Sequence, residues 1–230
     1  MEKLCEENFP DIRENYGKIR ENIDKAMSLA NRRDEVKVMA VTKTVPPERV
    51  NFAVGLGIGL LGENRVQEYL EKRGSYVNAE VHFIGGLQTN KVKYIIDKVS
   101  MIHSVDSVRL AEEIDRRAAQ HGRIMDILAE INIGDEETKG GISAEKAMDF
   151  CGEISRLENI RLRGLMTIPP AGCEEEVFAR MQELYENIKA SQNGGLFDTL
   201  SMGMSGDYQA AIKYGATVVR IGSALFGQRK

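Results

Sequence analysis

The chain has 230 residues, of which 42% are hydrophobic and 29% charged, and its formal net charge is −4. This length suits one large domain, and the composition is that of an ordinary soluble globular protein. The negative balance argues against a nucleic-acid partner, because no bulk positive field is present to replace the counterions of phosphate.

The amino-terminal segment and the cysteines indicate the expected compartment. Residues 1–22 are rich in charge and lack the apolar core of a secretory signal, and no apolar run is long enough to span a bilayer. Cys5, Cys151 and Cys173 are scattered, which supports neither a disulfide framework nor a zinc site. We therefore expect a cytoplasmic protein with free thiols and no bound metal.

Short apolar runs alternate with amphipathic stretches along the chain. Apolar residues spaced three or four apart predict a first helix over 6–30. Strands are then predicted at 36–41, 58–62, 81–85, 101–105, 124–133, 162–168, 200–203 and 217–222. Helices are predicted from Pro46-Pro47 onward, at 63–72, at 90–98, at 107–120 with Asp106 as N-cap, from Glu174 onward, at 207–214 and at 223–226.

This alternation predicts an α/β fold with parallel strands covered by helices. A count of about eight strand–helix units favours a closed TIM-type barrel. We expect one domain over 1–230, with 1–33 as a helical extension and 34–230 as the barrel. An open Rossmann-like sheet fits the pattern as well, but no G-x-G-x-x-G or P-loop motif follows a strand.

Lys43 follows the first predicted strand directly. Because Met39 and Val41 are apolar, strand alternation points Lys43 toward the barrel interior. An amine in a confined, partly desolvated cavity favours its neutral form, which attacks an aldehyde. A solvated lysine at a strand end fits the same spacing.

Two glycine-rich segments follow the last two predicted strands, at 201–207 (SMGMSGD) and at 220–223 (RIGS). Loops at these places in a TIM barrel recurrently bind phosphate, since backbone N–H groups can approach an anion there. Turns that only cap helices are the alternative. Arg220, two residues before Gly222, should share its inward face, where it either meets a ligand or forms a salt bridge across the barrel mouth.

Other polar residues are less informative. Asn64 could line the pocket, whereas Glu63 and Arg65 fit a helix start with solvated charges. His82 and His103 lie within predicted strands, where a packed core histidine is more common than an acid–base group.

An ordered set of motifs runs through most of the chain: AVTKT at 40–44, GENRVQE at 62–68, HFIGGLQTNK at 82–91, GLMTIP at 164–169, and the segments 200–207 and 219–227. In this set and order the chain resembles the pyridoxal phosphate (PLP) homeostasis proteins, which are related to the barrel domain of alanine racemase. It departs from the usual pattern at Thr42, Val81 and Gly86, none of which is a lysine or phosphate position.

The resemblance implies a fold-type III PLP barrel in which PLP forms an aldimine with Lys43. By the same resemblance Ser205, Gly222 and Ser223 hold the phosphate, Arg220 faces the pyridine nitrogen and Asn64 lies near the ring.

The implied function is a non-catalytic PLP carrier that supports vitamin B6 and amino-acid balance, with PLP-dependent apoenzymes as possible recipients and a monomer or weak homodimer as its state. An amino-acid racemase is the alternative, but the chain ends soon after the eighth strand, so we expect it to lack the additional domain that supplies a second acid–base group. A TIM-barrel hydrolase or aldolase that uses Lys43 on a carbonyl substrate is a third possibility.

Overall fold

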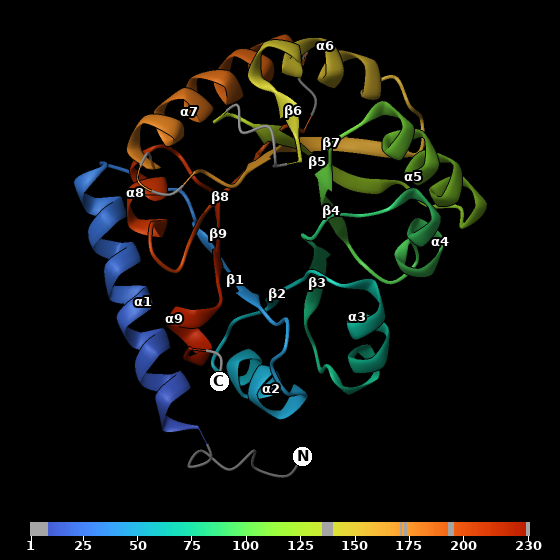
Figure 1. The fold of residues 1–230 in the computed structure, drawn as a ribbon. Coiled ribbons are helices and arrows are strands. Elements are labelled where there is room, and N and C mark those ends of the chain that lie inside the picture. The colour runs from blue at the N-terminus through green and yellow to red at the C-terminus, as the bar shows by residue number, and fades with distance from the viewer. Residues whose placement is uncertain (1–8, 135–139, 171, 173, 193–195, 229–230) are drawn as a thin grey trace.

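Eight parallel strands among the described residues close into a barrel (Figure 1). The computed structural model describes residues 9–134, 140–170, 172, 174–192 and 196–228. The barrel strands are β1 (Lys37–Val41), β2 (Leu60–Glu63), β3 (Glu80–Phe83), β4 (Met101–Val105), β5 (Met125–Asn132), β7 (Ile160–Thr167), β8 (Thr199–Met204) and β9 (Val218–Ile221). Pairing of β4 with β5 closes the ring, and the predicted TIM-type fold is confirmed.

Helices form a ring around the strands (Figure 1). They are α2 (Pro47–Gly55), α3 (Val66–Lys72), α4 (Val92–Ile95), α5 (Val108–Gln120), α6 (Ala144–Ile154), α7 (Glu174–Ser191), α8 (Tyr208–Lys213) and α9 (Ser223–Phe226), with 3-10 turns η1 (Arg73–Ser75) and η2 (Thr89–Lys91). A short strand, β6 (Ile142–Ser143), pairs with the end of β5 outside the barrel ring.

The predicted extra amino-terminal helix is α1 (Pro10–Leu29), which lies beside α8 and α9 (Figure 1). Its buried side chains Ile12, Ile19 and Ile23 recur at helical spacing, as one apolar face requires. Polar contacts add to this packing, since the Asn15 amide donates to the Leu225 carbonyl at 3.0 Å. The helix therefore packs against the last two helices, α8 and α9.

Two kinds of apolar core follow from strand alternation. The larger core lies between the strands and the helices and includes Ile102, Ile127 and Phe178. Inside the barrel, Met39, Leu60, Ile84 and Val218 form one cluster, and Met101, Leu128 and Met166 form another. These apolar side chains fill much of the middle of the barrel.

Some local predictions are wrong. Glu63 ends β2 and is buried instead of starting a helix, because its side chain finds hydrogen-bond donors beside the strand. Ser107, not Asp106, caps α5, accepting a bond from the Leu110 amide at 3.4 Å. Strand β6 was not predicted. Cys5 and Cys173 lie outside the described residues, while Cys151 is buried in α6.

Across the described ranges, none of the helices combines the length and the apolar character that crossing a membrane requires.

Gly164 on β7 offers a direct test of the barrel packing. Its φ is +151°, and a Cβ there would lie 1.7 Å from the carbonyl oxygen of Thr199, its partner on β8. We expect Gly164→Ala to lower the free energy of unfolding by roughly 3 kcal/mol, because a backbone atom cannot move aside without breaking strand pairing. Urea denaturation measures this change.

Gly152→Ala is the matched control, since Gly152 lies on the exposed face of α6, and a Cβ added there would have no atom within 4 Å. There alanine should raise stability by about 0.5–1 kcal/mol through its higher helix propensity. Equal effects of the two substitutions would contradict the close approach of β7 and β8.

Candidate functional site

The carboxyl ends of the strands gather the predicted site residues at one mouth of the barrel. Lys43 occupies a turn directly after β1, in which the Val45 amide donates to the Thr42 carbonyl at 3.0 Å. Lys43 is half-buried. The inward positions before it are Met39, in the barrel interior cluster, and Val41, which packs against that cluster. The predicted position of Lys43 at the carboxyl-end mouth is therefore what the structure shows.

A network of hydrogen bonds holds the residues on either side of Lys43. The Thr42 hydroxyl donates to Glu63 Oε1 at 2.7 Å, and Lys72 Nζ donates to the Thr42 carbonyl at 3.3 Å. The Thr44 amide donates to the Glu68 carboxylate. Thr44 has a φ of +63°, which a non-glycine residue adopts only when its surroundings hold it there. These bonds fix the backbone on both sides of Lys43.

Glu63 is the buried member of this network. Its Oε1 accepts bonds from Thr42 and from the Tyr76 hydroxyl, whereas its Oε2 has no hydrogen-bond partner among the described residues. Burial raises the pKa of the Glu63 carboxyl, and the hydrogen bonds from Tyr76 and Thr42 oppose that rise. The prediction of a solvated Glu63 is thus wrong, because β2 runs one residue further than expected and turns this side chain toward Thr42.

The loops after β8 and β9 meet at Ser205. The Ser205 hydroxyl oxygen accepts bonds from the backbone N–H of Gly222 at 3.2 Å and of Ala224 at 3.1 Å. Ser223 stands between them at the first position of α9 and is exposed. The structure therefore brings together the predicted anion-binding set of Ser205, Gly222 and Ser223, with N–H donors beside an exposed hydroxyl.

Glycines bring the neighbouring loops to the same mouth. A Cβ on Gly222 would lie 3.5 Å from the Cβ of Val41, which places the β9 loop beside the end of β1. A Cβ on Gly85 would lie 2.1 Å from the backbone oxygen of Asn64, so only glycine lets the β2 and β3 loops approach this closely. The Asn64 Oδ1 atom is buried and has no partner within the described part of the chain.

Arg220 is buried inside the barrel, with an exposed fraction of 4%. Its Nη1 donates to the Ser201 carbonyl at 2.7 Å and to the Ser201 hydroxyl at 2.9 Å, and its Nη2 donates to the Thr167 carbonyl at 2.8 Å. Burial lowers the pKa of Arg220 to about 10, so the guanidinium keeps its charge at neutral pH. Over the described residues these bonds involve three of its five N–H donors and no carboxylate, so the predicted alternative of a salt bridge is not what holds it.

Glu130 on β5 was missed in the sequence. Alternation from Asp126, which lines a cavity in the barrel, and Leu128, which lies in an interior cluster, turns Glu130 inward. Burial and then the charge of Asp106 raise the pKa of Glu130 from its ordinary value of 4.5 to about 7, against the opposing effect of Arg220. The period-two pattern of Asp126, Leu128 and Glu130 was the signal that could have revealed it.

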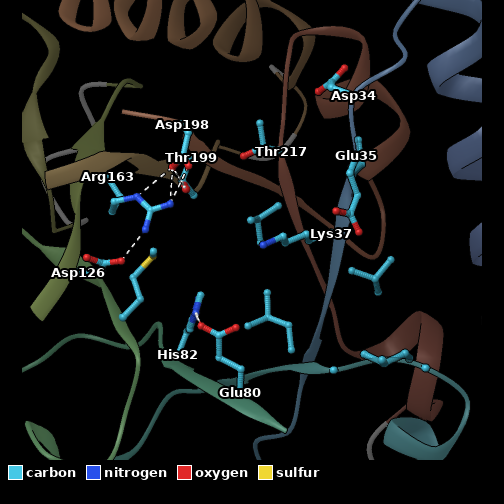
Figure 2. A pocket seen from close by; sticks show the side chains of 18 of the residues that line it. Asp34, Glu35, Lys37, Glu80, His82, Asp126, Arg163, Asp198, Thr199 and Thr217 are labelled. Carbon is cyan, nitrogen blue, oxygen red and sulfur yellow. Dashed lines mark hydrogen bonds and ion pairs between the residues drawn. The ribbon is translucent and has the colours of Figure 1, made fainter. Parts of the chain in front are cut away.

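A cavity of about 540 Å³ lies at the opposite, amino-terminal end of the barrel (Figure 2). It is lined by the first residues of several strands, among them Lys37, Glu80 and Thr199. Arg163 is already paired there with Asp126 and with Asp198, the latter at 2.7 Å. The cavity is also lined by the acidic side chains Asp34, Glu35 and Glu80, which would repel a phosphate dianion. Despite the size of this cavity, the carboxyl-end mouth is therefore the better cofactor site.

The family model of the alanine racemase N-terminal domain matches residues 15–230. The alanine racemase of Clostridium difficile 630 shares the fold, with a TM-score of 0.69 at 19% identity, and this chain covers 56% of it. The protein is thus a barrel of the alanine racemase N-terminal type.

Nearer relatives define the family. The pyridoxal phosphate homeostasis protein of Aquifex aeolicus is 44% identical over 224 residues, which are 94% of this chain and 98% of the relative. That of Escherichia coli K12 is 34% identical, with 95% and 97% covered. PipY of Synechococcus elongatus, solved with PLP bound, is 30% identical with a TM-score of 0.77, over 90% of this chain and 100% of PipY. This chain belongs to the pyridoxal phosphate homeostasis protein family, as the motifs predicted.

The raised pKa of Glu130 predicts that the stability of the protein depends on pH through this carboxyl group. Because the folded state holds this proton more tightly than the unfolded chain does, its contribution to stability is fully present below about pH 4.5 and is lost as the pH rises through about 7. Glu130→Gln should therefore lose less stability between about pH 5 and pH 8 than the wild type, by about 1–3 kcal/mol. Urea unfolding at both pH values measures this.

Glu153→Gln, a change on the exposed face of α6, is the control and should follow the wild-type pH dependence. If Glu130→Gln and the wild type lose stability in parallel, Glu130 is solvated and does not face the barrel interior.

Proposed function

We propose that this chain binds PLP at the carboxyl-end mouth of the barrel and acts as a cytoplasmic, non-catalytic PLP carrier in vitamin B6 homeostasis and amino-acid balance. One observation carries the proposal. The half-buried lysine after β1, the Ser205 cluster after β8 and β9, and the buried cation Arg220 all converge on one mouth. PipY, a relative of this chain, has been solved with PLP bound.

The residues present fit the chemical groups of PLP. When bound, PLP supplies an aldehyde that condenses reversibly with an amine, which is the part we assign to Lys43. The hydroxyls of Ser205 and Ser223 suit a phosphate, and the N–H groups of Gly222 and Ala224, which donate to the Ser205 hydroxyl in this structure, can donate to the phosphate once that hydroxyl rotates away. The buried Asn64 Oδ1, which lacks a partner among the described residues, has hydrogen-bonding capacity to spare for a ligand.

Arg220 supports a carrier more than a catalyst. Among the described residues Arg220 donates to Ser201 and Thr167, which leaves two of its five N–H groups for a further acceptor. A guanidinium beside the pyridine nitrogen donates to it without protonating it, which weakens the ring as an electron sink. The curated relatives, which match over almost their whole length, are named homeostasis proteins. An amino-acid racemase is the alternative function.

We further propose that residues 34–230 act as one PLP-binding barrel domain with 1–33 as its helical extension, working as a monomer or weak homodimer. PLP-dependent apoenzymes are the proposed recipients of the cofactor.

Lys43→Ala tests the covalent attachment. The wild type, incubated with PLP and reduced with borohydride, should gain the mass of one reduced PLP, and peptide mapping should place it on Lys43. Lys43→Ala should lose this adduct while retaining weaker, non-covalent binding through the phosphate contacts. Lys18→Ala, on the exposed face of α1, is the control and should behave as the wild type does. An adduct of wild-type yield in Lys43→Ala would refute the assignment.

The PLP-loaded protein incubated with L-alanine distinguishes a carrier from a racemase. We expect no D-alanine above the level produced by free PLP, since a carrier has no aligned second acid–base group. D-alanine that accumulates in proportion to the protein would establish the racemase instead. A colourless protein that refuses added PLP would favour the hydrolase or aldolase interpretation.

A further inference from the structure

A line of polar side chains crosses the barrel interior from the amino-terminal cavity to Arg220. His82 Nε2 lies 3.0 Å from Glu80 Oε1, His82 Nδ1 lies 2.9 Å from His103 Nε2, and His103 Nδ1 lies 3.1 Å from Ser201 Oγ. Ser201 Oγ in turn accepts from Arg220 at 2.9 Å. Figure 2 shows the lower end of this line, where His82 meets Glu80 at the cavity.

The line is closed to solvent along most of its length. The exposed fraction is 5% for His82 and 0% for both His103 and Ser201. Strands β4 and β8, which carry His103 and Ser201, are not neighbours in the sheet, so this bond crosses the interior of the barrel. The prediction of two packed core histidines thus holds for their burial, but their ring nitrogens are joined into one chain of hydrogen bonds.

The guanidinium determines the direction of every bond in the line. A guanidinium only donates, so Ser201 Oγ accepts from Arg220 and its single hydrogen goes to His103 Nδ1. Any other arrangement leaves this buried hydrogen without an acceptor among the described residues. His103 Nδ1 is then unprotonated, and the proton of the neutral ring is on Nε2, which donates to His82 Nδ1. By the same logic His82 carries its proton on Nε2 and donates to Glu80.

The electrostatics agree with a neutral His103 ring inside the barrel. Burial, with the positive charge of Arg220, holds the pKa of His103 well below its ordinary value. At the cavity end, the hydrogen bond from His82 lowers the pKa of Glu80, which keeps an ionised acceptor at the end of the line.

We propose that Ser201, His103 and His82 are positioning residues that hold the Arg220 guanidinium through a one-directional line of hydrogen bonds, and that protonation of His82 from the amino-terminal cavity breaks that line. A second proton on His82 would sit on Nδ1 and face the Nε2–H of His103, so two donors would oppose each other. His103 could remove this conflict by carrying its proton on Nδ1 instead of Nε2. That proton would then face the hydrogen of the Ser201 hydroxyl, so the two donors would conflict there. The alignment of Arg220 thereby depends on the far end of the barrel.

Several charged and titratable groups surround His82 and bear on its protonation. Glu80 contacts His82 from within β3, and His103 contacts it from β4. The other charged groups that line the same cavity are Arg20, Asp34, Glu35, Lys37, Asp126, Arg163 and Asp198. Arg220 acts on His82 through Ser201 and His103. That Arg220 faces a cofactor rests on the proposed function, whereas the hydrogen-bonded line itself does not.

Histidine NMR of the full-length, cofactor-free protein tests the line directly. The chain has only 3 histidines, so a long-range ¹H–¹⁵N spectrum contains one pattern for each, with exposed His121 as the reference. We expect His82 and His103 both to be neutral Nε2–H tautomers near pH 7. On acidification His103 should change its tautomer when His82 becomes protonated. A neutral Nδ1–H form of either ring near pH 7 would overturn the proposal.

Ser201→Ala removes the link between the histidines and Arg220. We expect His103 in this variant to become a mixture of tautomers, because its Nδ1 no longer accepts a hydrogen bond from the Ser201 hydroxyl. Ser104→Ala is the matched control, since Ser104 is equally buried on β4 but donates to the Gly85 carbonyl at 2.6 Å instead of joining the line. It should leave both tautomers unchanged. If Ser201→Ala does not fold, the wild-type tautomers still decide the question.

The cofactor provides a second readout. Ser201→Ala should bind PLP about fivefold more weakly than the wild type, the size of one hydrogen bond, because Arg220 loses its side-chain acceptor. A wild type that takes up no PLP would refute the proposed function and leave the tautomers as an independent test. Nδ1–H tautomers in a protein that binds PLP would refute the positioning line alone. Unchanged affinity in Ser201→Ala would also refute it.

Discussion

A guanidinium buried within a barrel of strands is the constraint on which the site depends. A charge taken out of water is tolerated only where acceptors are built around it. Arg220 on β9 finds them on β8, at the Ser201 carbonyl and hydroxyl, and on β7, at the Thr167 carbonyl. These bonds join three neighbouring strands near their carboxyl ends, where the loops after β7 and β8 begin. The same guanidinium gives the mouth a fixed donor, and it determines the direction of hydrogen bonding down to the opposite cavity.

The two ends of the barrel consequently differ in chemistry. The carboxyl-end mouth presents N–H groups, hydroxyls and Lys43, whose turn is fixed by the hydrogen bonds of Thr42 and Thr44. The amino-terminal end presents a wide cavity whose carboxylates are partly neutralised by Arg163. An anion with an aldehyde matches the first end and not the second. The histidine line connects the two ends past the apolar clusters around Met39 and Leu128.

The order of strands and the positions of the loop residues could be predicted because each depends on local patterns. Alternation in β1 and the glycine-rich segments after β8 and β9 placed Lys43, Ser205 and Gly222 at one mouth. The environment of Glu63 could not be predicted, since it depends on β2 ending one residue later than expected and on a contact with Thr42, which is 21 positions away. The bond between His103 and Ser201 joins residues 98 apart across the barrel, so the histidines gave no signal beyond burial.

A crystal structure of this chain with PLP would show where the cofactor lies in the barrel. We expect continuous density from Lys43 Nζ to the ligand, with the phosphate beside Ser205 and Gly222 and the pyridine nitrogen within hydrogen-bonding distance of Arg220. Density for PLP in the amino-terminal cavity, or a Lys43 side chain directed away from the bound ligand, would contradict this expectation.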